Sequence, residues 1–361
     1  TIRSGHVVTI NSSIVYDQVI IENGAQVVVA PGISHTLADG PGNDLTINGT
    51  WLNQGGTWSI VGSARWIVND GGVYVHNTTG SISTPFSKAI LSSSSTFVYR
   101  GSSGLVPAST FSGRTYGNLH LESTGGVLAI SASGSGSLII NGSLVIGVGV
   151  RWSTGGFSGN ISVGRDAFIQ GEWSGSGSGS QGVHTFGGVF TIGSGGKYTL
   201  ATTGQPQGNL LYKGDIFCHA PFLAPAGRTL ELRGDGLQKI GGEAKITLTN
   251  GANAESDVEI TAGSIVEIGP GKSLVACRGL LLSGSVVGGD SASRLVFSGN
   301  DTLIANNGEA TVPVIFSGGM GTKYFTGDGG WSSLTFDSTS STIIAGRHVL
   351  RGAGTPLTVQ G

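Results

Sequence analysis

The sequence predicts an all-β fold in which short strands stack as the coils of a parallel β-helix, or β-solenoid. Each coil is expected to take roughly 20–25 residues, with little or no α-helix. Two observations predict this fold. Strand-turn-strand segments recur at long offsets, and short runs of alternating apolar and polar residues are repeatedly interrupted by Gly, Asn or Ser. Because no amphipathic stretch is long enough to cross over between parallel strands as a helix, an α/β fold is excluded.

The first repeat pairs VIIENGAQVVVAPG (Val19–Gly32) with VEITAGSIVEIGPG (Val258–Gly271). The second aligns YGNLHLESTGGVLAI (Tyr116–Ile130) with WSSLTFDSTSSTIIA (Trp331–Ala345) without gaps. The offsets are 258 − 19 = 239 and 331 − 116 = 215, and they differ by 24 residues. That difference is close to one coil, so we interpret the chain as two related halves that differ by one coil.

A shorter ladder lies between the repeats. Arg151–Ser153 (RWS) is followed 172 − 151 = 21 residues later by Glu172–Ser174 (EWS) and 197 − 172 = 25 residues after that by Lys197–Thr199 (KYT). In stacked coils, equivalent residues lie about 4.8 Å apart. The central aromatic rings are therefore predicted to stack face to face, beside a column of alternating charges.

The domain prediction is a single continuous β-solenoid over residues 1–361. It can be subdivided into a first half (1–135), middle coils (136–250) and a second half (251–361). The low-complexity run GEWSGSGSGSQG (Gly171–Gly182) is predicted to be a loop leaving the stack, and a linker between domains is the alternative.

Composition narrows the class of protein. The chain has 65 Gly in 361 residues and 38% hydrophobic residues, mainly in short alternating runs, so glycine separates strands rather than marking disorder. Charged residues make up only 11%, the net charge is −2 and no basic block occurs, which argues against nucleic acid as a partner. No apolar run is long enough for a membrane-spanning helix.

Two cysteines, Cys218 and Cys277, are too few for a disulfide scaffold. One disulfide bond and two unpaired buried thiols are both open alternatives.

Three sequence features resemble secreted bacterial surface proteins of the right-handed parallel β-helix type. They are the opening SGHVVTI (Ser4–Ile10), the coil pattern G-x-x-V-x-V-x-P-G (Gly24–Gly32) and the unit STFVYRG…TYGNLHLESTGG (Ser95–Gly126). The resemblance implies a secreted, extracellular protein at the cell surface. Some members of that class are adhesins or passenger domains and others are polysaccharide lyases or hydrolases, so the resemblance leaves both functions open.

Polysaccharide-cleaving members, as the resemblance implies, need carboxylates for calcium or for acid/base chemistry, together with Lys or Arg. The densest charge in the chain lies between Lys213 and Lys245. The candidate catalytic residues within it are Glu231, Arg233, Asp235 and Lys239. The alternative is a surface patch of ion pairs. No metal site is predicted and no cofactor is expected, with calcium left open.

Aromatic residues supply the candidates for carbohydrate binding, because a solenoid face can display evenly spaced rings. The candidates are Trp66, Tyr74, Trp152, Trp173 and Tyr198. The alternative is that these rings pack inside the coils or in ladders.

These features favour an extracellular structural or adhesive β-solenoid over a polysaccharide-degrading enzyme, which is kept as the alternative. Strand-like residues at both ends, Thr1–Ile2 and Pro356–Val359, predict either part of a longer surface protein or self-association end to end into a fibre. A polysaccharide or a cell-surface glycan is the expected partner.

Overall fold

A computed structural model describes most of the chain. The described residues are 1–175, 182–199, 208–223, 228–249, 251–255, 257–276, 279–298, 303–316, 322–336, 341–344, 349–350 and 357–359. They form an all-β parallel β-solenoid with turns of about 23 residues and 1% helix, which confirms the predicted fold class. Tertiary contacts divide the chain into two compact units, Thr1–Ser174 (unit 1) and Gly175–Gly361 (unit 2). The division falls within the low-complexity run at Gly171–Gly182.

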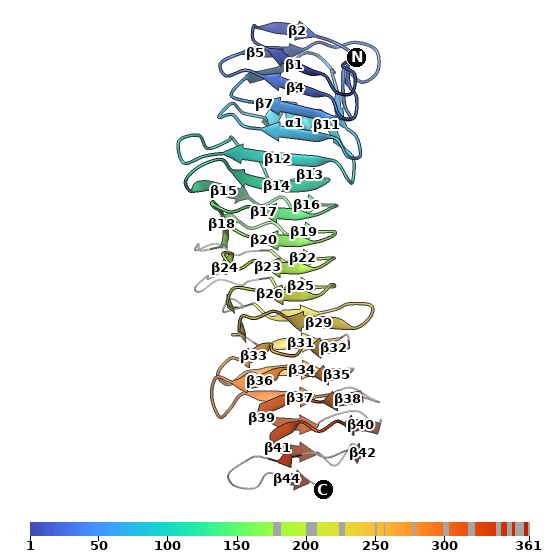
Figure 1. Ribbon diagram of the computed structural model, residues 1–361, viewed down its shortest axis with the longest axis vertical. Coiled ribbons are helices and arrows are strands. Elements are labelled where there is room, and N and C mark those ends of the chain that lie inside the picture. The colour runs from blue at the N-terminus through green and yellow to red at the C-terminus, as the bar shows by residue number, and fades with distance from the viewer. Residues whose placement is uncertain are drawn as a thin grey trace. The chain divides into compact units, whose positions relative to one another are not determined.

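Unit 1 is built from parallel strands that stack one coil above the next in columns (Figure 1). Its longest column, column B, consists of β1 (Val7–Ile10), β4 (Gln26–Val29), β7 (Thr50–Asn53), β10 (Val73–His76), β12 (Thr96–Gly101), β14 (Asn118–Ser123), β17 (Leu144–Ile146) and β20 (Ala167–Ile169). Two shorter columns flank its first coils. One consists of β3 (Val19–Ile21), β6 (Leu45–Ile47), β9 (Trp66–Val68) and β11 (Ala89–Leu91). The other consists of β2 (Ile14–Tyr16), β5 (Ser34–Leu37) and β8 (Thr57–Ile60).

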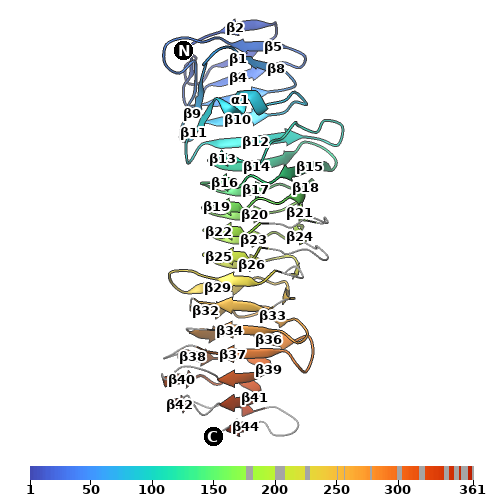
Figure 2. The same ribbon diagram turned by 180° about the vertical axis from the view of Figure 1, so that it is seen from behind.

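The flanking columns of unit 1 change midway along the stack, and only column B continues. A single helical turn, α1 (Ser83–Ser87), lies just before β11 in the sequence. Beyond it the flanking columns are β13 (Arg114–Tyr116), β16 (Leu138–Ile140) and β19 (Ile161–Val163), and β15 (Leu128–Gly134), β18 (Val150–Phe157) and β21 (Glu172–Ser174) (Figure 2). Column B is therefore the one column of unit 1 that runs through both sets of coils, before and after the change.

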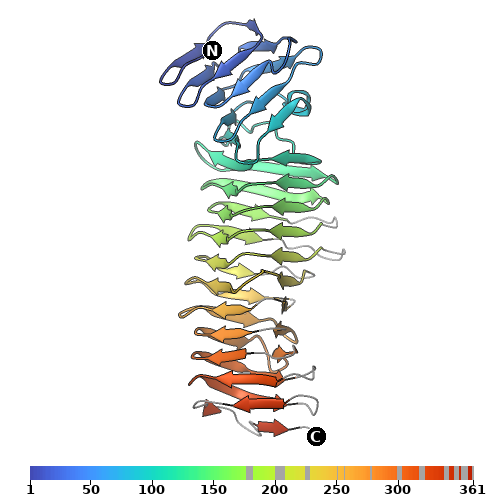
Figure 3. The ribbon, with the colours of Figure 1, turned by 90° about the vertical axis from the view of Figure 1, so that its right-hand side faces the viewer.

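Unit 2 repeats the same construction, and Figure 3 shows the coils of each unit edge-on. One column is β23 (Phe190–Ile192), β26 (Ile216–Cys218), β29 (Gln238–Gly241), β32 (Val258–Ile260), β35 (Leu280–Leu282), β38 (Leu303–Asn306), β40 (Thr322–Thr326) and β42 (Ser341–Ile344). A second is β22 (His184–Phe186), β25 (Leu210–Tyr212), β28 (Leu230–Leu232), β31 (Ala252–Ala254), β34 (Ser273–Ala276) and β37 (Arg294–Phe297). A third is β27 (Phe222–Leu223), β30 (Ile246–Leu248), β33 (Ile265–Ile268) and β36 (Ser285–Gly288).

The second and third columns of unit 2 merge at a long irregular strand. The first residues of β39 (Glu309–Phe316) pair with β36, and its last residues pair with β37. The remaining strands are β24 (Lys197–Thr199), β41 (Gly330–Phe336), β43 (Val349–Leu350) and β44 (Leu357–Val359).

The alternation in the sequence sets which side chains enter the core. In β4, Val27 and Val29 are buried, whereas Gln26 and Val28 are partly exposed on the outer face. The interior of unit 1 is unusually rich in aromatic rings in edge and stacked contacts. Trp58 and Trp66 have ring centroids 4.7 Å apart, and the centroid of Tyr74 lies 5.0 Å from that of Trp66. The coils are thus held together by backbone ladders outside and by interlocking rings inside.

Glycine allows close contact between coils at one recurring corner. A Cβ added at Gly49, Gly117 or Gly171 would lie closer than 3.0 Å to two backbone carbonyl oxygens of the preceding coil. At Gly117 those oxygens belong to Ser92 and Ser95. Because backbone cannot move aside as a flexible side chain can, only glycine fits there without shifting a coil. This explains part of the high glycine content on packing grounds.

The substitution Gly117→Ala is expected to destabilise unit 1 by about 1–3 kcal/mol, since the added methyl group overlaps backbone oxygens. Gly125→Ala is the matched control, because a Cβ there meets nothing within 4 Å. We expect the control to be neutral or slightly stabilising. Urea unfolding monitored by tryptophan fluorescence measures both variants. Equal effects of the two substitutions would contradict the packing argument.

Candidate functional site

Of the four described residues predicted as catalytic candidates, Glu231 and Arg233 are in contact with one another in unit 2. Glu231 lies on β28, and Arg233 follows that strand directly. The Arg233 Nη2 atom contacts a carboxylate oxygen of Glu231 at 2.9 Å and one of Glu255 at 3.2 Å. The Glu231 side chain is only 14% exposed, and its carboxylate also accepts a hydrogen bond from the Asn209 side chain. Glu231 and Arg233 are thus brought together, in a network that already occupies both carboxylates.

Lys239 lies on β29, in a different column from Glu231. Its ammonium group is 3.6 Å from a carboxylate oxygen of Glu259, which is its direct partner on β32. Its backbone N–H donates to Asp215 Oδ1 at 2.8 Å. Asp235 lies exposed in the turn between β28 and β29. The turn therefore leads the chain from the column of β28 to the column of β29. The charged residues between Lys213 and Lys245 are consequently divided between two faces of the coil.

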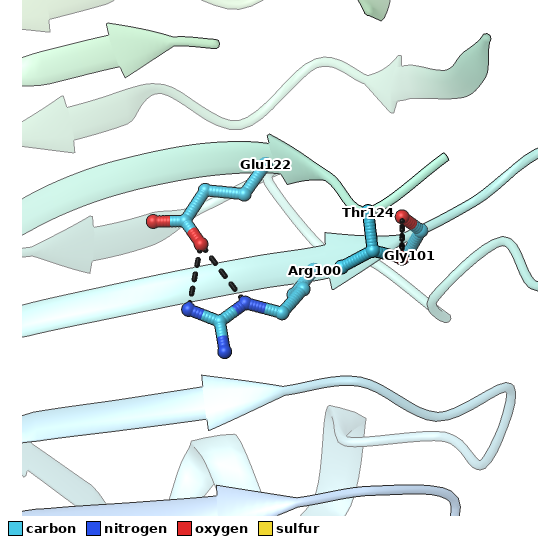
Figure 4. A network of polar contacts seen from close by, with 4 residues as sticks. All are labelled: Arg100, Gly101, Glu122 and Thr124. Carbon is cyan, nitrogen blue, oxygen red and sulfur yellow. Dashed lines mark hydrogen bonds and ion pairs between the residues drawn. The ribbon is translucent and has the colours of Figure 1, made fainter. Parts of the chain in front are cut away.

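Ion pairs between consecutive coils recur well beyond this window. In unit 1, the Arg100 guanidinium contacts Glu122 Oε2 through Nη2 at 2.7 Å and through Nε at 2.9 Å, and Thr124 Oγ1 donates to the Gly101 carbonyl beside it (Figure 4). Arg100 and Glu122 are direct strand partners of β12 and β14. The outer faces thus use opposite charges as cross-strand pairs, the arrangement that stabilises neighbouring strands.

The predicted ladder is confirmed where it lies within unit 1. Arg151 pairs with Glu172 and Trp152 with Trp173 in the predicted register. Arg151 Nε lies 3.0 Å from Glu172 Oε2. The two indoles have centroids 4.6 Å apart but are tilted by 39°, so the expected face-to-face stacking is wrong in detail. The ring quadrupole disfavours a face-to-face sandwich, which explains why the two indoles are not parallel.

The five aromatic residues singled out for carbohydrate binding lie inside the coils. Trp66, Tyr74, Trp152 and Trp173 have no exposed surface, and Tyr198 is 2% exposed. Large rings fill the wide apolar interior, and a buried ring cannot stack on a sugar without opening a coil. Interior packing, the alternative for these rings, is the arrangement observed, and carbohydrate binding by them stays a prediction.

Among the described residues, no group of three or more His, Cys, Asp or Glu side chains could hold a metal ion. Cys218 is a buried free thiol whose pKa burial raises to about 12, and Cys277 lies outside the described residues. An open hollow of about 260 Å³ is lined by Thr1, Ile2, Arg3, His6 and Val8 in the first coil of unit 1. Within the described residues, no helix is long and apolar enough to cross a membrane.

Sequence reasoning missed a buried arginine in unit 2. Arg228 is completely buried, its Nε donates to the Gly208 carbonyl at 2.6 Å, and its Nη2 donates to the Gly182 carbonyl. Burial lowers its pKa below the ordinary arginine value, and the phenols of Tyr198 and Tyr212 act in the opposite direction. Arg228 therefore links backbone segments that are 20 and 46 residues away in the sequence. No pattern in the sequence signals this role, because charge normally lies outside.

Aspartates at corners join neighbouring coils through hydrogen bonds. Asp39 Oδ2 accepts from the backbone N–H of Ser63 at 3.0 Å and from its hydroxyl at 2.8 Å. Asp70 Oδ1 accepts the same pair of bonds from Ser94, at 3.1 and 2.6 Å. These hydrogen bonds lower the pKa of both carboxyls below the usual aspartate value. The ionised aspartates thus stabilise the fold.

Stability is expected to fall as the solution becomes acidic. Burial lowers the pKa of His35 and of His76 to about 4 in the fold. A depressed pKa gives stability that is fully present above the unfolded value, ~6.5 for histidine, and lost as pH falls through the folded value. The lowered pKa values of Asp39 and Asp70 also make the fold less stable toward acid, but at lower pH than the histidines. The raised pKa of Asp17, caused by desolvation and by Asp44, opposes them.

Thermal unfolding between roughly pH 7 and pH 4 tests this expectation, because the stability contributed by the two neutral histidines is lost across that range. The unfolding temperature should decrease steadily toward acid. His76→Phe removes one of the titrating groups and should flatten the profile. An unfolding temperature that rises toward acid would contradict the assignment of neutral buried histidines.

Comparison with protein-family models, with curated proteins and with solved structures found no match to this chain.

Proposed function

We propose that the chain is an extracellular structural or adhesive β-solenoid, displayed at a cell surface as part of a longer protein or of an end-to-end fibre. One observation carries the proposal. Charged side chains on the outer faces pair from one coil to the next, as Arg100 does with Glu122, Arg151 with Glu172, and Lys239 with Glu259. Charges used in this way link coils and do not converge on a substrate.

The distribution of the few charges also disfavours a catalytic pair of carboxylates. A catalytic pair of carboxylates needs space for a sugar between an acid and a second carboxylate or a water molecule. Glu231 and Glu255 instead both contact the Arg233 guanidinium, and Asn209 binds Glu231 as well. An extracellular location and a glycan partner are supported by the resemblance to bacterial surface proteins described above. We place any glycan-binding surface on the outer strands, because the candidate rings are internal.

Immunogold electron microscopy of cells that produce the protein tests the proposal. We expect label on the cell surface, or on filaments that extend from it. Label confined to the cell interior would contradict the proposed location and function.

Glycan binding has its own assay, co-sedimentation with insoluble cell-wall polysaccharides. An adhesive scaffold binds and leaves no soluble sugar in the supernatant. Release of sugar that Glu231→Gln abolishes would contradict the scaffold and establish the enzyme.

A further inference from the structure

Four polar rings pack together in the first coils of unit 1. Tyr16 lies on β2, His35 on β5, Trp51 on β7 and Trp58 on β8. The His35 ring centroid is 5.5 Å from that of Trp51 and 5.4 Å from that of Trp58, and the two indoles are 6.0 Å apart. Trp58 also packs on the Trp66 ring, with a centroid separation of 4.7 Å. The four rings thus form one cluster, in which His35, Trp51 and Trp58 are buried and Tyr16 is partly exposed.

Among the described residues, three ring nitrogens of this cluster are buried and make no hydrogen bond of ordinary geometry, although Trp58 also interacts with the Tyr16 phenol, whose pKa is raised by burial and lowered by that contact. The three nitrogens are His35 Nε2, Trp51 Nε1 and Trp58 Nε1. The neighbouring indole of Trp66 differs, because its Nε1 donates to the Pro85 carbonyl at 2.7 Å. A buried polar atom without a hydrogen-bond partner lowers the stability of the fold. In native interiors such atoms are therefore hydrogen-bonded to protein groups or to bound water.

We propose that His35, Trp51 and Trp58 form an internal binding site for ordered water. Buried water of this kind bonds to two to four polar atoms that the protein itself leaves unpaired. The three nitrogens come from three different strands, β5, β7 and β8, so water held there joins three segments of the first coils.

The chemistry of the cluster selects water over an ion. Burial lowers the pKa of His35 to about 4, so the imidazole is neutral near pH 7 and offers no charge to an anion. An indole N–H is a donor only and cannot ligate a metal cation. Water can accept from both indoles and can also donate to an imidazole nitrogen.

The hydrogen bond between the Tyr16 hydroxyl and His35 Nδ1, at 3.0 Å, is consistent with either imidazole tautomer. If the hydroxyl donates, His35 Nε2 carries the proton and donates to water. If Nδ1 donates, Nε2 accepts from water. Water satisfies both cases, whereas an acceptor-only ligand satisfies one.

Nuclear magnetic resonance on the intact chain tests the site, with water as the probe. The indole N–H signals are assigned by single Trp→Phe substitutions, and cross-relaxation from each N–H to the water signal is then measured. We expect cross-peaks of long-lived bound water at Trp51 and Trp58. Trp66 is the internal control, since its N–H is bonded to Pro85, and it should show none.

Two results would overturn the site. One is the absence of water cross-peaks at Trp51 and Trp58 while the signals themselves are sharp. The other is a high-resolution crystal structure in which Trp58 Nε1 bonds directly to the Tyr16 hydroxyl and no water oxygen lies within about 3.2 Å of the three nitrogens. Water density at that distance from at least two of them would confirm the site independently of the spectra.

Discussion

The substitution Trp152→Ala is expected to lower the free energy of unfolding of unit 1 by about 3–5 kcal/mol. Trp152 is completely buried on β18, and its ring contacts those of Phe111 and Trp173. Because strands on either side are fixed by backbone ladders, the coil cannot collapse into the space left by the indole. Urea unfolding monitored by circular dichroism gives the loss directly.

Val148→Ala is the matched control for this variant. Val148 lies in the turn just before β18 and is 71% exposed. We expect its effect to stay within about 0.5 kcal/mol. If Trp152→Ala were as mild as the control, the ring could not be an internal support, and the carbohydrate role of this tryptophan would have to be reopened.

The substitution Arg228→Met is expected to destabilise unit 2 by about 2–6 kcal/mol. Methionine keeps the apolar stem but removes the donors to the Gly182 and Gly208 carbonyls. Each buried carbonyl that loses its partner costs about 1–3 kcal/mol. Hydrogen exchange should show the loss in β22 and β25, the strands next to those carbonyls.

Arg233→Met tests whether any arginine would have the same effect. Arg233 is 46% exposed, and its contacts to Glu231 and Glu255 are made near solvent. Exposed ion pairs contribute about 0–1 kcal/mol, so the control should be mild. A larger loss at Arg233 than at Arg228 would contradict the view that the buried guanidinium holds the coils together.

The sequence was sufficient to predict stacked coils, because a two-residue alternation interrupted by glycine leaves few other folds. It was also sufficient to predict the partnership of Arg151 with Glu172. The copies of the first repeat nevertheless occupy different places. Val19–Val29 spans β3 and β4, which leads into column B of unit 1. Val258–Ile268 spans β32 and β33, which leads out of the corresponding β32 column. Alternation defines the inner and outer faces of a strand but not its column.

The candidate site was harder to predict, because the sequence does not show which column each charged residue occupies. Glu231 and Lys239 are close in the sequence, but one turn places them in different columns. The ion-pair partners of Arg233 and Lys239, which are Glu255 and Glu259, lie one coil further on, and only the coil period could have identified them. His35 and Arg228 follow the inward pattern, yet composition alone expects polar residues outside. Interior polar groups therefore required the structure.

The central claim is that the outer charges join coils and do not act on a substrate. The most direct measurement compares sugar release from a polysaccharide panel by the natural chain and by the charge-swapped variant Lys239→Glu with Glu259→Lys. The swap preserves a link between β29 and β32 but exchanges the chemistry at each position. The account predicts no released sugar from either protein and similar resistance to unfolding. Sugar release by the natural chain that the swap abolishes would contradict it.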